Sequence, residues 1–455
     1  MKKILFIIML FPSLLLGEPK ISGSFPQESD FVVPAATEKN QGKKNYTISA
    51  IENIGFIVGL WGYDRYVAEE YWAVIGFNSI EANFQNGFEW DHGGFAMNQI
   101  AHPYSGSIYF TAARSNNLSF LESSAYVLGG SLLWESFMEN HYPSINDMIT
   151  TTFGGIALGE VLYRLSNHFY NDNVTGTKKV VNEFITTLLC PMNSLNRHLD
   201  YSSPKRENSQ IQYTFSFGGN NNFMSDQIEK MDANIFAGFQ LEYNKMFQDK
   251  KIRKPFDYFK AAIDISLYKG ETVSSIILLG HLIGREINQE SYSILAGAFQ
   301  NFYYTNNDII RLSSSSIGPG VEIKSVLTEK IHLNAGFQVH GILLGAMDSR
   351  YNEENRDYNL GPGYSILSYL KFGRNDLIRM SISSRYFSLS NVAGLAASER
   401  IWIIESGVDF PIYRTLRFGL NYNYFDRQEN YDEYDEYDDV SGYGDLLRSY
   451  LTISF

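Results

Sequence analysis

Apolar and polar side chains alternate one by one from about residue 209 to the C-terminus. Between Ile331 and His340 every odd position is apolar and every even position is polar or glycine. The segment from Leu416 to Phe425 follows the same rule, with leucine, phenylalanine and tyrosine on its apolar face. A strand with one apolar and one polar face must bury its apolar face and expose its polar face to water. The pattern predicts about twelve strands, which start near residues 209, 231, 256, 274, 292, 310, 330, 362, 376, 400, 414 and 444.

The connections between these segments alternate in length. The tight ones are at residues 327–330, 373–376 and 411–415, and the long ones are at 346–362, 391–399 and 426–443. Short turns at one end and long loops at the other are typical of outer-membrane barrels, and an even strand number puts both chain ends in the periplasm. We therefore predict a transmembrane antiparallel β-barrel of about 12 strands over residues 205–455. The alternative is a soluble β-sandwich or lipocalin-like barrel, whose apolar face points inward.

The polar face of a membrane barrel lines its lumen. The candidate lining residues are Glu242, Lys260, Asp264, His332, His340, Arg379, Arg385 and Arg417. For about twelve strands, ion pairs that fill a narrow lumen are a better interpretation than a selective pore. The segment Asp426–Asp439 is a dense run of acidic residues and tyrosines. It lacks the glycine turn and ligand spacing of a calcium loop, so a solvated external loop is expected.

Residues 45–200 change to a helical period. Charged residues repeatedly interrupt their apolar stretches, so that Glu122 and Glu135 bracket one run while Asp147 and Glu160 bracket another. Neither run reaches the roughly 20 residues that a membrane-spanning helix needs. We expect these helices to pack on one another, on the periplasmic mouth of the barrel, or at the membrane interface. Small residues at helical spacing favour close packing of helix backbones, and they are Thr151, Gly155 and Gly159 in one segment and Gly129 and Gly130 in another.

The two ends of the chain indicate export. Residues 1–17 combine a charged start with a short apolar run, which is typical of a secretory signal peptide, and residues 18–44 form a polar lead-in. The last six residues alternate and end on Phe455, as in the closing strand that the barrel-insertion machinery reads. A single cysteine, Cys190, excludes an internal disulfide, and the net charge of -13 argues against a nucleic-acid partner.

The helical half also contains a candidate catalytic group, consisting of His102, Glu135 and Glu139. The supporting polar residues are Asn98, Arg114, Asn146 and Asp147. Pairs such as Asn98 and His102 are four residues apart and share a helix face. A histidine with carboxylates could transfer protons or hold a metal. No compact metal signature or nucleophile-elbow motif accompanies it. We therefore predict no cofactor and leave a metal open.

Each member also has a structural interpretation. Ser144 before the next helix fits an N-cap, with Asp147 three positions later. Glu160 and Arg164 fit a simple surface ion pair, and His102 would close a helix. Carboxylates at 135 and 139 lie beside an apolar face, so they would need Arg114 or His102 as a partner, because an unpaired buried charge is costly. We therefore prefer a structural role for these residues in hydrogen bonding, and a catalytic role is the second interpretation.

Three segments resemble a bacterial family, the domain of unknown function 3943. They are AHPYSGSIYFTAARSN (101–116), SLLWESFMENHYPSINDMITTTFGGIALGEVLYRLSN (131–167) and PMNSLNR (191–197). The resemblance covers about residues 76–200 and implies an export signal before the domain and a strand-rich region after it. Cys190 departs from the pattern, where Asn is expected before Pro191. The resemblance implies an architecture and no reaction.

The sequence predicts two alternative functions. The first is an outer-membrane protein with an envelope structural or small-solute transport role, whose helical domain lies on the periplasmic side. The alternative is a membrane-edge hydrolase that acts on a lipid or cell-wall substrate through the His and Glu cluster. The expected partners are outer-membrane lipid and the barrel-insertion machinery, and the oligomeric state stays open.

Overall fold

The computed structural model describes residues 43–171, 173–199, 209–224, 233–244, 254–268, 271–307, 309–351, 358–374, 377–395, 397–431 and 437–455. The predicted signal peptide and nearly all of the predicted lead-in lie outside the described residues. So does the junction at 200–208, and the predicted domain boundaries stay predictions.

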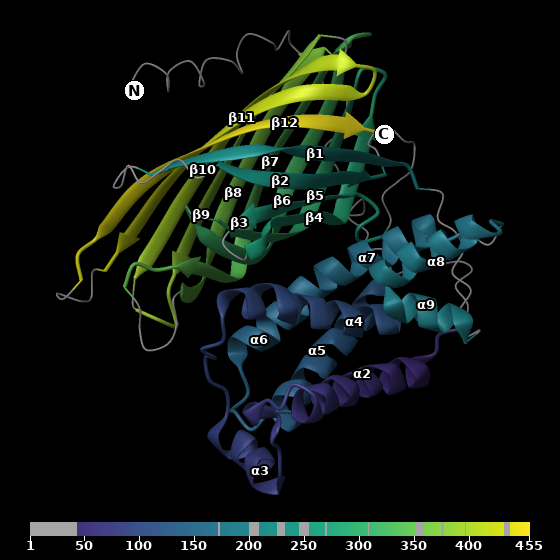
Figure 1. Ribbon diagram of the computed structural model, residues 1–455, viewed down its shortest axis with the longest axis vertical. Coiled ribbons are helices and arrows are strands. Elements are labelled where there is room, and N and C mark those ends of the chain that lie inside the picture. Colours follow the sequence, from purple (N-terminus) through teal and green to yellow (C-terminus); the bar gives the residue numbers. More distant parts are fainter. Residues whose placement is uncertain are drawn as a thin grey trace, which may run out of the picture. The chain divides into compact units, whose positions relative to one another are not determined.

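Twelve antiparallel strands close into one barrel. They are β1 (Ile211–Met224), β2 (Ala233–Tyr243), β3 (Phe259–Tyr268), β4 (Glu271–Asn288), β5 (Tyr292–Asn306), β6 (Arg311–Thr328), β7 (Ile331–Asp348), β8 (Tyr358–Arg374), β9 (Ile378–Ser390), β10 (Ser398–Tyr413), β11 (Leu416–Asn430) and β12 (Val440–Ser454). Each strand pairs with its sequence neighbours, and β1 closes the barrel on β12 (Figure 1). The predicted fold class, a helical region followed by this barrel, is confirmed.

The barrel is apolar outside and polar inside. Along β11, Phe418 and Leu420 are exposed, whereas Arg417 before them and Asn423 after them are buried. The buried face is the lumen, because Arg448 of β12 reaches Asp264 of β3 at 2.7 Å across the width of two intervening strands. The soluble alternative, with its apolar face inward, is therefore wrong.

The acidic segment 426–439 is only partly a loop. Its first five residues continue β11 to Asn430. Arg427 in this stretch pairs with Asp348 of β7 at 3.0 Å between Nη1 and Oδ2. The expectation of a solvated loop is wrong for these residues, because an inward-facing arginine with a carboxylate partner extends the barrel wall. Residues 432–436 of the segment lie outside the described residues.

The helical region precedes the barrel. Its elements are α2 (Tyr46–Tyr66), η2 (Tyr71–Ala73), α3 (Phe77–Asn86), η3 (Met97–Ala101), α4 (His102–Ser115), α5 (Phe120–Phe137), α6 (Ile145–Ile149), η4 (Thr150–Gly154), α7 (Gly155–Phe169), α8 (Thr177–Leu189) and α9 (Pro191–His198). The turns η3 and η4 are π-helical and run directly into α4 and α7. Within the part of the chain that the structure describes, none of the helices has both the length and the apolar content needed to cross a membrane.

Glycines allow the backbones of α4 and α7 to come into contact where the two helices cross. A Cβ on Gly155 would lie 2.6 Å from the Cα of Gly106, so the two backbones touch at this point. Gly159 lies under Phe110 and Gly130 lies under Tyr109, each closer than a Cβ would permit. The predicted close packing is confirmed at these positions, but Gly129 faces open space. The crossing places the start of α4 beside η4, where the candidate site lies.

The helical region packs against the outer wall of the barrel. Tyr303 of β5 contacts Phe387 of β9, with ring centroids 5.0 Å apart, and these non-neighbouring strands can meet only through the lumen. The adjacent residue Tyr304 therefore points outward, where it stacks on Phe95 with centroids 5.6 Å apart. On the same outward face, Gln300 donates from Nε2 to the carbonyl of Phe153 at 2.9 Å. The helical residues in these contacts thus lie outside the barrel, not within its lumen.

Candidate functional site

Three separate segments meet where α5 ends and α6 begins. A short parallel bridge joins them, because the N–H of Glu89 donates to the carbonyl of Pro143 at 2.9 Å and the N–H of Ile145 donates to the carbonyl of Glu89 at 2.8 Å. The bridge brings the segment before η3 against the start of α6. We call the side chains gathered here the acidic cluster, and its members are Asp91, His102, Glu135, Glu139 and Asp147.

Glu135 lies at the buried end of α5. Its side chain is 2% exposed, and its Oε2 accepts from the N–H of Ser144 at 2.9 Å. Ser144 is the predicted N-cap of α6, since its Oγ accepts from the N–H of Asp147 at 3.1 Å. Burial is the main cause that raises the pKa of Glu135 well above its ordinary value, and the nearby Glu139 and Asp147 raise it further.

Glu139 lies just beyond α5 and is half-buried. Its Oε1 accepts from Nε1 of Trp134 at 2.5 Å. Burial raises the pKa of Glu139 to about 7, although Trp134 and His102 act to lower it. A carboxyl of this kind is partly protonated near neutral pH, which is the range in which it can both donate and accept a proton.

His102 and Asp147 face each other across the helix crossing. Nε2 of His102 lies 3.6 Å from Oδ1 of Asp147, and Nδ1 lies 3.3 Å from Oγ1 of Thr151. Asn146 holds the carboxylate, because its Nδ2 donates to Asp147 Oδ1 at 2.8 Å. Burial is the main cause that raises the pKa of Asp147. The expectation that His102 closes a helix is wrong, because it is the first residue of α4 and follows η3 without a break.

The loop before η3 supplies the fourth carboxylate. Asp91 accepts through Oδ2 from the N–H of Gly93 at 2.7 Å and from Nδ2 of Asn98 at 3.2 Å. Its own N–H donates to Oδ1 of Asn146 at 2.8 Å. Sequence reasoning missed Asp91, and the dipeptide of two glycines that follows at 93–94 was the signal that could have found it, since glycines often accompany a loop that approaches polar groups closely.

Arg114 lies in a different network. Its Nε and Nη2 bind the two carboxylate oxygens of Glu160 at 2.8 and 3.1 Å, and Nε of Arg164 binds Oε1 of the same group at 2.7 Å. All three side chains are buried. The expected surface pair between Glu160 and Arg164 is therefore wrong, and Arg114 is not the partner of Glu135 or Glu139. Arg164 continues to the barrel, where it donates to Asp257 at 3.1 Å and to the carbonyl of Pro255 at 2.7 Å.

The acidic cluster is thus four carboxyls and one imidazole, open to the outside through the partly exposed His102 and Glu139. The predicted residues His102, Glu135, Glu139, Asn98, Asn146 and Asp147 converge there, and Arg114 does not. Among the described residues, no group of three or more histidine, cysteine, aspartate or glutamate side chains has the arrangement of a metal site. The close approach of His102 to Asp147, with 3.6 Å between Nε2 and Oδ1, is suited to proton transfer.

The lumen is the second candidate site. Polar side chains from opposite walls meet in it, as when Lys260 of β3 pairs with Glu322 of β6 and donates to the hydroxyl of Tyr369 of β8 at 2.7 Å. Gln338 of β7 donates to the same glutamate at 2.9 Å. Further pairs involve Glu242 with Lys324, Arg385 with Glu405, Asp264 with Arg448, and Arg417 with Asp409. The predicted filling of the lumen by ion pairs is confirmed for these residues.

A cluster of apolar side chains lies in the lumen further along. It contains side chains from the strands β5 to β7 and β9 to β12 and from the connection between β5 and β6. Its buried members are Tyr303, Ile309, Ile310, Leu312, Ile342, Met347, Phe387, Leu389, Ile401, Ile403, Phe425 and Leu446. These residues pack as one cluster toward the ends of the strands that carry the longer loops. Two layers, one charged and one apolar, therefore lie across the barrel interior.

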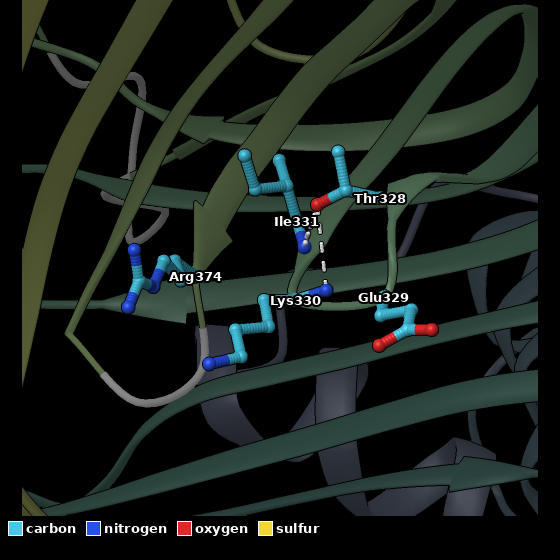
Figure 2. Close-up of a pocket in the computed structure, with 5 residues that line it drawn as sticks. All are labelled: Thr328, Glu329, Lys330, Ile331 and Arg374. Carbon is cyan, nitrogen blue, oxygen red and sulfur yellow. Dashed lines mark hydrogen bonds between the residues drawn. The ribbon is translucent and has the colours of Figure 1, made fainter.

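A hollow on the barrel rim carries no predicted site residue. It lies at the turn between β6 and β7 and is lined by Thr328, Glu329, Lys330, Ile331 and Arg374 (Figure 2). Oγ1 of Thr328 accepts from the backbone N–H groups of Lys330 and Ile331 at 3.4 and 3.2 Å, as Figure 2 shows. This hollow is a consequence of the turn.

The family described as "Domain of unknown function (DUF3943)" matches residues 87–192, which confirms the resemblance found in the sequence. No curated protein matches this chain.

The solved structures that resemble it include the NanC porin, with 10% identity, a TM-score of 0.27, and coverage of 51% of this chain and 98% of that one. The KdgM porin in complex with disordered oligogalacturonate has 6% identity and a TM-score of 0.28, over 53% and 99%. In-vitro folded OmpT of Vibrio cholerae in its trimer form has 10% identity and a TM-score of 0.22, over 54% and 100%. At these TM-scores the likenesses carry no argument about solute or assembly.

Proposed function

We propose that this chain is an outer-membrane protein whose barrel anchors its helical region and does not conduct solutes. The exposed apolar outer face of the barrel supports a lipid environment. The observation that carries the proposal is the pair of layers across the lumen, in which Lys260, Glu322 and Tyr369 join opposite walls and an apolar cluster lies beyond them. Of the roles expected from sequence, these layers favour structural anchoring over transport.

Conductance tests this proposal. The full chain, folded in detergent and shown to float with liposomes, is added to planar bilayers. We expect no stepwise current for the wild type. A double variant, Lys260→Ala with Glu322→Ala, removes the charged pair alone, and we expect it to stay silent too, because the apolar cluster remains in the lumen. Stepwise conductance of the wild type would overturn the anchor proposal, and failure to float would overturn the membrane assignment.

A second function is favoured by the convergence of the acidic cluster. The alternative hydrolase requires a group that exchanges protons near neutral pH, and Glu139, with its pKa raised to about 7 by burial, is such a group at the open edge. His102 lies beside it and contacts Asp147 at 3.6 Å. In this proposal Glu139 is the proton acceptor, and His102 with Asp147 is a second proton-transfer pair. The substrate is an envelope lipid or cell-wall component.

An envelope profile tests the second function. Lipids and cell-wall fragments are compared between cells that lack the protein and the same cells complemented with wild type, Glu139→Gln or Glu183→Gln. Glu183 lies in an exposed ion pair on α8 and is the matched control. A species that accumulates without the protein and is cleared by wild type and the control, but not by Glu139→Gln, supports the enzyme. Clearance by all three complements would overturn it.

The finer points of location are also proposals. Two contacts tie the helical region to the rim that carries the barrel's chain ends, because Arg164 reaches Asp257 and Phe169 stacks on Tyr213 with centroids 6.4 Å apart. In an outer membrane this rim faces the periplasm, which supports the predicted periplasmic location for this end of the helical region. Recognition of the strand that ends at Phe455 by the insertion machinery stays a prediction.

A further inference from the structure

The helices cover positions on the barrel that would otherwise face lipid. Along β5 the outward residues of the first half are exposed or half-exposed, whereas every residue from Phe299 to Asn306 is buried, so both faces are covered there. On β4 the outward Leu278 is buried under the helical region, whereas Ile283 and Ile287 on the outer face of the same strand are exposed. Helix-covered and exposed apolar positions thus follow one another on the same outer surface.

The attachments extend from one rim of the barrel to the other. Tyr213 and Asp257 lie at the rim with the chain ends, whereas Tyr358 is the first residue of β8 at the opposite rim and contacts Phe95 with ring centroids 5.4 Å apart. A tilted strand as long as β8 rises roughly 40 Å from one rim of the barrel to the other. This rise exceeds the roughly 25 Å height of the apolar band of outer-membrane barrels. The helical region therefore passes the full height of that band.

The free faces of the helices match this environment. On α5 the exposed side chains Leu121, Leu128 and Leu132 lie on one face, and the buried Val127 and Trp134 lie on the other side of the helix. No charged residue occurs between positions 123 and 134. On α2 the exposed aliphatic side chains are Ile51, Ile54 and Val58, and positions 53–63 are also free of charge. In water these faces would be costly, at about 25 cal/mol for each Å² of apolar surface left exposed.

We propose that the helical region lies in the hydrocarbon layer beside the barrel, and that lipid acyl chains cover the apolar faces of α2 and α5. The proposal rests on the membrane location proposed above. Continuity of the surface identifies the occupant, because the helices occupy part of the lipid-facing wall and their outer faces extend that wall outward.

Site-specific quenching tests the proposal. Cys190 is the single cysteine, and it is buried, so Cys190→Ala provides a cysteine-free full chain. A polarity-sensitive fluorophore is attached to each of four single-cysteine variants, Val58→Cys, Leu132→Cys, Leu420→Cys and Lys178→Cys. The first two report α2 and α5, Leu420 reports the outer face of β11, and Lys178 reports an exposed polar position on α8. Each variant is inserted into phosphatidylcholine vesicles with or without a quencher on the acyl chains.

We expect quenching at Val58 and Leu132 to be within about twofold of that at Leu420, and severalfold stronger than at Lys178. Strong quenching at Leu420 with values like Lys178 at both helix positions would overturn the lateral location while the barrel assignment stands. Absent quenching at Leu420 would overturn the membrane assignment itself, and with it this inference. Two helix positions on separate elements guard against misfolding of one variant.

Discussion

The side chain of Asn98 donates from Nδ2 to the hydroxyl of Tyr358 at 2.8 Å, although the two residues are 260 positions apart in the chain. The same hydroxyl donates to the carbonyl of Gly93 at 2.8 Å. Asn98 also binds Asp91 of the acidic cluster. A barrel residue on the outer wall therefore takes part in holding the loop that supplies one of the four carboxyls.

Removing this hydroxyl should loosen the loop. Tyr358→Phe keeps the ring against Phe95 and deletes both hydrogen bonds, which leaves the buried amide of Asn98 and the partly buried carbonyl of Gly93 without these partners. We expect a local loss of about 1–3 kcal/mol, seen as faster amide hydrogen exchange over residues 93–102. Tyr364→Phe, at an exposed tyrosine of the same strand, should leave this exchange unchanged. Equal exchange in both variants would show that the contact does not hold the loop.

The glycine contact between α4 and α7 gives a sharper test of packing. In Gly155→Ala the new methyl would lie 2.6 Å from the backbone of Gly106, so the helices must separate. We expect a destabilisation of about 1–3 kcal/mol, measured as a lower midpoint of the helical circular dichroism signal during unfolding. Gly129→Ala is the control, because nothing lies within 4 Å of its added methyl. That variant should gain about 0.5–1 kcal/mol from helix propensity, and a loss would contradict the packing described.

The buried charge network should tolerate no loss of its central carboxylate. Glu160→Gln leaves the buried Arg114 without its carboxylate partner and leaves Arg164 with Asp257 alone. Breaking a buried pair in this way costs about 3–5 kcal/mol, so we expect the helical region to unfold well below the wild-type midpoint. Glu183→Gln disrupts the exposed pair with Lys179 instead and should change stability by less than about 0.5 kcal/mol. Similar midpoints for the two variants would argue against a buried network.

Patterns among neighbouring residues predicted the helices and strands, but they could not predict contacts between residues that are far apart in the chain. Each observed strand begins within four residues of its predicted start, because alternation is a property of neighbouring residues. The role of Ser144 as an N-cap was equally local. The partner of Arg114 was not, since Glu160 is 46 residues away and every carboxylate on a helix was an equal candidate. Outward-facing apolar residues alternate along a strand in the same way whether lipid or a packed helix covers them. The sequence around Phe302 and Tyr304 therefore gave no indication that helices cover these two residues.

The acidic cluster should make stability depend on pH through Glu139. Burial raises the pKa of this carboxyl from 4.5 to about 7 on folding, so between these values the folded chain binds a proton that the unfolded chain releases. Stability must therefore fall as pH rises through this window and level off above it. Glu139→Gln remains neutral and keeps the capacity to accept from Trp134, so it should lose the part of this dependence that Glu139 contributes, while Glu135 and Asp147 keep theirs.

The measurement is the midpoint of thermal unfolding, followed by helical circular dichroism of the full chain in detergent at about pH 5 and about pH 8. The variant and the wild type should agree at the lower pH, and the variant should be more stable by a few degrees at the higher pH. Glu81→Gln, at an exposed carboxyl on α3, should follow the wild type at both values. If Glu139→Gln shows the same loss of stability between the two values as the wild type, the carboxyl at 139 is not the group that titrates, and its role as a proton acceptor loses its physical basis.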